Sequence, residues 1–191
     1  MIRKLLKSDW QSIGVFFLLC VAVGLSIPPF RFLIEQSMMM QMVIQMPLLF
    51  IGGAFLNHFP RAKKITQFVS PFNTFGLTGF MLAQIILIYW MLPISIDRAV
   101  VIPIYDIAKV ISMIIAGFWV GDALERSPPA LQLFFIGYFA AMMIWLGIYF
   151  INSDLRLCNV YSLSSQYWTG YCLCFISAAI VTFWSFLVLK K

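Results

Sequence analysis

Charged side chains are scarce in this sequence. Only 10% of its 191 residues are Asp, Glu, Lys or Arg, whereas 62% are hydrophobic. A soluble domain typically has about 25% charged and about 45–50% apolar residues, so a water-soluble core cannot accommodate this composition. A bilayer can, because each helix that crosses it needs about 20 mostly apolar residues. The composition therefore excludes a separate soluble domain and predicts an integral membrane protein.

Histidine and the motifs of soluble enzymes are also lacking. The single histidine, His58, stands at the end of an apolar run, where we interpret it as a solvated loop residue. The sequence contains no G-x-S-x-G, no P-loop and no G-x-G-x-x-G motif. With one histidine, on the predicted inner side, a His-based metalloenzyme or a haem-ligating site is hard to build. We therefore predict that the chain is not an enzyme.

The excess of basic residues does not indicate nucleic-acid binding. Lys and Arg outnumber Asp and Glu and give a formal net charge of +6. These basic residues stand in short clusters at the ends of apolar runs, where they are expected to set membrane orientation. We therefore expect the lipid bilayer as a partner and no nucleic acid.

Six apolar runs are each long enough to cross a bilayer. Their approximate ranges are 12–34, 38–56, 75–93, 100–124, 130–151 and 168–189. They are apolar all round, which is typical of lipid-embedded helices, and they lack the alternating segments of about ten residues that a membrane β-barrel needs. The predicted fold is an all-α integral membrane bundle of about six transmembrane helices, with residues 1–191 as one domain.

The positions of Lys and Arg predict the orientation. With six spans, one side of the membrane carries Arg3, Lys4, Lys7, Arg61, Lys63, Lys64, Arg126, Lys190 and Lys191. The other side has Arg31, Arg98 and Arg156, and Lys109 falls inside a span. Basic residues favour the cytoplasmic side, so we predict an inner (plasma) membrane protein with both termini cytoplasmic. The first run could instead be a signal peptide, but no clear A-x-A site follows it, and we interpret it as an anchor.

Methionine and glutamine recur at the start of the second run, on the predicted outer side. Met38, Met42 and Met46 follow one another at i, i+4 and i+8, with Gln41 and Gln45 beside them. Side chains four residues apart share one helix face, so three thioethers would form a stripe. Thioether sulfur is a soft ligand suited to Cu(I), but methionine also fills gaps in helix packing. The stripe leaves both roles open.

The third run ends at the same outer level with Trp90-Met91-Leu92-Pro93. Tryptophan at this depth is normally an interfacial anchor, and we expect that role for Trp90. Met91 would lie near the level of Met38, so the end of this run brings a further thioether to the outer side.

Two ionisable residues stand near the start of the fourth run. Asp106 and Lys109 are three residues apart and can pair on one helix face. Ionisable groups within a span are costly and usually face protein or a water-filled cavity. They are either a buried ion pair that fixes helix packing or a ligand or proton site.

Cysteines add soft groups to the outer side. Cys20 lies in the first run and Cys158 in the last outer loop, whereas Cys172 and Cys174 lie in the outer part of the last run. Cys158 and Cys172 could form a disulfide in an oxidising compartment, and the Cys172 and Cys174 thiolates could instead bind copper. The candidate ligands for Cu(I) are Met38, Met42, Met91, Asp106 and Cys172.

Taken in order, the outer-end segments resemble the CtaG family of membrane proteins. That family has a His- and Met-rich start to a span, followed by Pro-Leu-Leu and a Gly, and the similar stretch here is Met38–Met46 followed by Pro47–Leu49 and Gly52. It also has a Trp-His-x-Pro motif, which corresponds here to Trp90–Pro93. The resemblance extends from about residue 35 to Gly170.

Two further segments continue the resemblance. The family has two histidines four residues apart before an Ala-Gly segment and a Trp, and here Asp106 and Val110 occupy the histidine positions before Ala116-Gly117 and Trp119. A late Asp-Gln-x-x-x-Gly is matched by the segment from Ser165 to Gly170. The family's histidines are therefore missing throughout. Any metal site must use different ligands or has been lost.

The CtaG family assists assembly of caa-type cytochrome c oxidases and is thought to handle copper. The resemblance therefore implies an accessory protein that acts on a membrane metalloenzyme such as an oxidase and handles Cu(I) at the outer face. A protein can keep the fold of a family and lose its activity. The alternative is therefore a metal-free interaction subunit that stabilises a membrane complex. A small transporter is a third, in which Asp106 and Lys109 would line a path.

Overall fold

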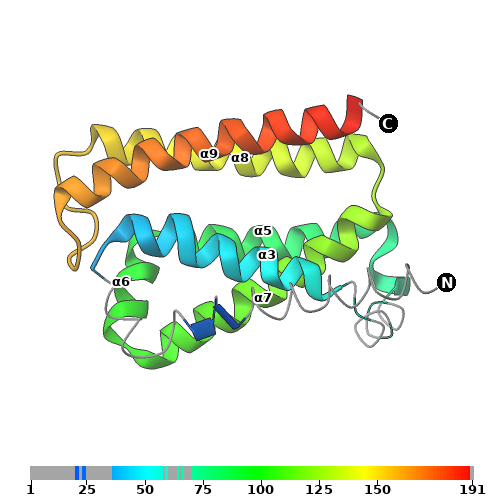
Figure 1. Cartoon of the computed structure of the whole chain (residues 1–191), viewed down its shortest axis with the longest axis horizontal. Helices are drawn as coiled ribbons and strands as arrows, with labels where there is room; N and C mark the ends of the chain where they lie inside the picture. The colour runs from blue at the N-terminus through cyan, green and yellow to red at the C-terminus, as the bar shows by residue number, and fades with distance from the viewer. Residues whose placement is uncertain are drawn as a thin grey trace.

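A computed structural model describes residues 36–57 and 70–189, together with residues 20, 21, 23, 24, 59, 64 and 66. Within this part the chain forms helices and short connections and no strand, which confirms the all-α prediction (Figure 1). The elements in order are the π-helix η1 (Met40–Gln45), α3 (Met46–Leu56), the 3₁₀ turns η2 (Ser70–Phe72) and η3 (Thr74–Gly76), α5 (Leu77–Met91), α6 (Pro93–Val101), α7 (Pro103–Arg126), α8 (Pro129–Asn152) and α9 (Leu163–Leu189).

Within the described residues, four helical segments are long and apolar enough to cross a membrane, which is the composition of a membrane protein. They are Thr74–Met91, Pro103–Arg126, Pro129–Asn152 and Leu163–Leu187. The second predicted run forms a shorter apolar helix, Met40–Leu56. Only residues 20, 21, 23 and 24 of the first predicted run are among the described residues, and His58 lies outside them. The number of six spans therefore stays a prediction.

The orientation also stays a prediction, and reporter fusions test it. Alkaline phosphatase is active only outside the cytoplasm, so a fusion after Lys191 should be inactive. A fusion after Arg156, in the connection between α8 and α9, should be active. An active fusion at Lys191 would show that the asymmetry of Lys and Arg does not orient this chain.

Proline marks where several helices begin. Pro93, Pro103 and Pro129 each occupy a first position of a helix, where the missing N–H would have no partner in any case. Ile102 is extended, as expected for a residue before proline. The fourth predicted span therefore begins at Pro103 rather than near residue 100. Residues 93–101 form the separate helix α6, which the sequence analysis did not predict.

Close approach of two helices depends on small residues. A Cβ atom added at Gly117 of α7 would overlap the Phe50 carbonyl oxygen of α3, and one added at Gly53 of α3 would overlap the Ile114 carbonyl oxygen of α7. Small residues at such positions let helix backbones approach closely in membranes. The helices α3 and α7 thus pack backbone against backbone.

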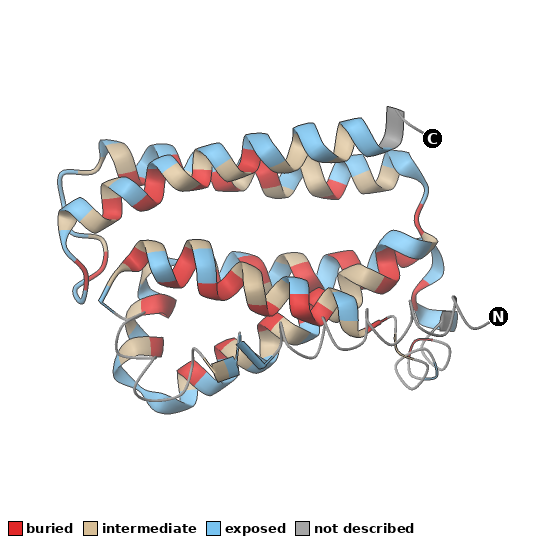
Figure 2. Ribbon diagram, in the orientation of Figure 1, coloured by how far each residue is buried: buried red, intermediate tan, exposed pale blue. Residues whose placement is uncertain are grey.

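The remaining helices complete two packed groups. The helix α5 packs on α7 as well, while α8 and α9 form an antiparallel pair. Figure 2 shows that buried residues concentrate on the sides of the helices that face one another. The outward sides carry exposed apolar residues such as Ile85, Trp145 and Phe175, which is expected where a helix contacts lipid.

Candidate functional site

One end of the bundle brings together the segments that the sequence singles out. We call it the η1 end, because η1 and α9 begin there, α5 and α8 end there, and α6 lies beside them (Figure 1, left). Hydrogen bonds join these segments: the backbone N–H of Met38 donates to Ser165 Oγ at 3.0 Å, and the Asn159 N–H donates to Asp97 Oδ2 at 2.8 Å. The predicted starts and ends of the spans are therefore neighbours in space.

The methionine stripe lies in the main apolar core. Met38, Met42 and Met46 are 0%, 4% and 5% exposed, and Met91 packs against the same core while partly buried. Met113 and Met143, from α7 and α8, belong to this core too, although the sequence analysis gave them no role. Thioethers from four different helical segments therefore share one apolar core.

The polar side chains of the stripe are buried as well. Gln41 is fully buried, and its Oε1 accepts a hydrogen bond from the hydroxyl of Tyr161, which lies just before α9. Its Nε2 is buried without a hydrogen bond in the part of the chain that the structure describes. The surrounding backbone is a π-helix, a rare form that occurs often at functional sites.

Asp106 and Lys109 form the predicted ion pair. Lys109 Nζ lies 2.7 Å from Asp106 Oδ1, and the two side chains are only 1% and 7% exposed. Of the two interpretations left open, the structure supports an ion pair that fixes packing. A metal ion on this carboxylate would lie beside the Lys109 ammonium, whose positive charge opposes it. Asp106 is therefore the least suited of the proposed ligands.

Cys172 lies apart from the methionine core. It is half-buried on α9, where its neighbour Leu173, and not Cys172 itself, belongs to that core. All four cysteines are free, so the structure contains no disulfide between Cys158 and Cys172. Among the described residues there is also no group of three or more His, Cys, Asp or Glu side chains that could hold a metal ion. A metal site built from the described residues of the η1 end would therefore depend on thioethers.

Cys158 is the one buried thiol at this end. It lies in the connection between α8 and α9, where its Sγ donates to the Pro93 carbonyl oxygen at 3.6 Å. Burial, together with the nearby Asp97 carboxylate, raises the pKa of the Cys158 thiol to about 12. The thiol therefore stays protonated near neutral pH and is a poor nucleophile and a poor thiolate ligand.

Trp90 does not have the expected role of an interfacial anchor. It is only 3% exposed, and its indole N–H donates to Ser112 Oγ of α7 at 2.7 Å. The adjacent Tyr89 is 41% exposed instead. Trp90 thus fastens the end of α5 to α7, because a buried indole N–H needs a hydrogen-bond acceptor.

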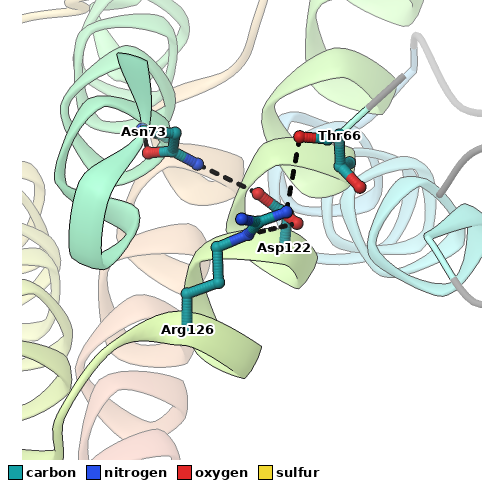
Figure 3. A network of polar contacts seen from close by, with 5 residues as sticks. Thr66, Asn73, Asp122 and Arg126 are labelled. Atoms are coloured by element: carbon teal, nitrogen blue, oxygen red, sulfur yellow. Dashed lines mark hydrogen bonds and ion pairs between the residues drawn. The ribbon is translucent and has the colours of Figure 1, made fainter. Parts of the chain in front are cut away.

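A second polar cluster lies at the opposite end of α7 (Figure 3). Asp122 accepts from Asn73 Nδ2 at 3.0 Å and from Arg126 Nε at 2.9 Å, and Arg126 Nη2 donates to the Thr66 carbonyl oxygen at 3.3 Å. Asn73 Oδ1 accepts the N–H of Gly79. Arg126 was predicted only to favour the cytoplasmic side, and the i, i+4 spacing of Asp122 and Arg126 is the one sign of this cluster in the sequence. These contacts join the segment before α5 to α7.

Three comparisons of the chain with known proteins find no match. No family model matches it, no curated protein sequence matches it, and no solved structure matches its fold. The resemblance to the CtaG family therefore gains no support from them. It rests on the segments quoted from the sequence and stays a prediction.

Proposed function

We propose that this chain is an accessory protein of a membrane metalloenzyme, of the kind that CtaG-type oxidase assembly factors represent, and that it handles Cu(I) through Met38, Met42 and Met91 at the η1 end. The observation that carries the proposal is that Met38 and Met42 are buried in one core, and that Met91, from a separate helical segment, packs against the same core while partly buried. A set of soft thioether ligands favours Cu(I) and disfavours Mg²⁺, which requires oxygen ligands.

The proposed ligand set is smaller than the one drawn from the sequence. Asp106 is engaged by Lys109, and Cys172 lies outside the methionine core. Thioethers carry no proton that a metal must displace, unlike thiolate or imidazole ligands. The affinity for Cu(I) should therefore change little between neutral and mildly acidic pH.

A Cu(I) titration of the purified protein under reducing conditions tests the proposal. The variant with Met38, Met42 and Met91 all replaced by leucine conserves volume and apolarity, and it should bind Cu(I) at least about a hundredfold more weakly, or about 3 kcal/mol. The matched control replaces Met40, Met81 and Met142 by leucine. Met40 and Met81 have exposed side chains, Met142 lies outside the core, and this control should bind as the wild type does.

The outcomes separate two functions. Equal Cu(I) binding by the wild type and the triple leucine variant would contradict the site. The second candidate is a metal-free interaction subunit that stabilises a membrane complex. It is favoured by the way the same methionines pack with Leu49, Leu87 and Ile96, as gap-filling residues do. If the wild-type protein binds no Cu(I), the result would favour this second function.

A further inference from the structure

The short helix α6 is expected at the surface of the membrane. It joins α5, which ends at Met91, to α7, which begins at Pro103, and both neighbours are long and apolar enough to span. Tyr89 is exposed in the last turn of α5, as expected for a tyrosine at the level of the headgroups. With only nine residues, α6 lies where the chain turns from one span to the next.

The two sides of α6 differ in character. Ser95, Ile96 and Ala99 are buried against the rest of the protein. The outward side carries Ile94, Arg98 and Val101 at i, i+4 and i+7, and the two apolar side chains are 59% and 69% exposed. An interfacial helix typically combines basic and apolar residues in this way, because its apolar groups enter the acyl boundary while the charge stays near the headgroups.

The charge on this outward side comes from Arg98, which contacts an aromatic ring and has no ion pair with another described residue. The Arg98 guanidinium lies 5.8 Å from the centroid of the Tyr105 ring, within range of a cation–π contact. No carboxylate pairs with Arg98 among the described residues. The adjacent Asp97 instead accepts the N–H of Asn159 at 2.8 Å, so its charge is directed to the connection between α8 and α9.

We propose that the outward side of α6 binds an anionic phospholipid, with Arg98 on the phosphate and with Ile94 and Val101 against the glycerol backbone and upper acyl chains. A planar guanidinium matches a phosphate oxygen pair, and its support by Tyr105 limits the side-chain freedom that binding would remove. The choline group of a zwitterionic lipid would add a positive charge near Arg98. This site is independent of the proposed Cu(I) site.

Native mass spectrometry of the protein taken from nanodiscs with equal phosphatidylglycerol and phosphatidylcholine tests the site. The wild type should retain phosphatidylglycerol preferentially. Arg98→Gln should lower the ratio of retained phosphatidylglycerol to phosphatidylcholine about fivefold, the effect expected for one basic residue at an anionic surface. The matched control is Arg156→Gln, which removes the same charge from the exposed connection between α8 and α9 and should leave the ratio unchanged.

Three results would overturn the proposal. An unchanged ratio in Arg98→Gln would remove Arg98 from lipid binding. An equal decrease in Arg156→Gln would show that diffuse charge, rather than this side of α6, selects the lipid. Displacement of phosphatidylglycerol by free glycerol phosphate at millimolar concentration would identify a site for soluble phosphates. Because Arg98 is exposed, its replacement should leave circular dichroism unchanged, and the ratio can then be interpreted directly.

Discussion

Replacing Asp106 by asparagine should lower the free energy of unfolding by about 3–5 kcal/mol, which is the usual cost of removing one partner of a buried ion pair. Asp106 and Lys109 are almost fully buried, and their charged atoms lie 2.7 Å apart. The substitution leaves the side chain nearly the same size but removes the charge that balances the Lys109 ammonium. Because a typical protein is stable by only about 5–15 kcal/mol, the variant should accumulate poorly in the membrane.

A second substitution shows whether pairing is the cause. Asp106→Asn combined with Lys109→Met removes both charges and should recover part of the lost stability, since a buried pair can often be replaced by apolar residues at little cost. Unfolding in detergent, followed by circular dichroism, measures all three proteins. The matched control is Asp154→Asn at an exposed position, which should change stability by less than about 0.5 kcal/mol. Equal losses in the single and double variants would mean that the two residues do not depend on each other.

The same variants bear on copper. If Asp106 has only a structural role, the double variant should bind Cu(I) as the wild type does once it is folded. If it loses Cu(I) binding while Met38, Met42 and Met91 are intact, then Asp106 contributes to the site despite its contact with Lys109. The stability experiment therefore also separates the structural from the ligand interpretation of this carboxylate.

Apolar composition was sufficient to predict the long helices but not the connections between them. The helices α7 and α8 follow the predicted runs to within about three residues, because proline and polar residues end them. The helix α6 was missed because nine residues with Asp97 and Arg98 in the middle carry neither a long apolar run nor a membrane signal. Such a helix forms where two spans must be joined, and the sequence does not show that geometry directly.

Periodicity predicted that the three methionines share one helix face, but it could not decide which of two neighbouring residues faces the protein. Met38, Met42 and Met46 are four residues apart and are all buried, as a shared face requires. For Tyr89 and Trp90, the sequence indicates the depth in the membrane but not which side chain faces the protein. The structure shows that Trp90 is buried and Tyr89 is exposed. The contacts of Asn73 and Thr66 in the Asp122 cluster could not be predicted either, because these two residues are far from Asp122 along the chain and only the fold brings them close.

Gly117→Ala should destabilise the bundle by about 3 kcal/mol, near the upper end of what inserting one methyl group into a packed core usually costs. The added Cβ would overlap the Phe50 carbonyl oxygen, and backbone cannot move aside as a flexible side chain can. At Gly121, one turn further along, an added Cβ would lie 2.6 Å from the Ala54 carbonyl oxygen, so α3 is close to α7 over more than one turn. The expected response is separation of the two helices.

Gly137→Ala is the matched control, because the same methyl group on α8 meets nothing within 4 Å. Alanine is the better helix former by about 0.5–1 kcal/mol, so this variant should unfold at the same or a higher temperature than the wild type. Thermal unfolding of both variants in detergent measures the difference. Since η1 continues directly into α3, separating α3 from α7 should also move Met42 relative to Met91 and weaken Cu(I) binding. An unchanged unfolding temperature for Gly117→Ala would mean that α3 and α7 do not pack backbone against backbone.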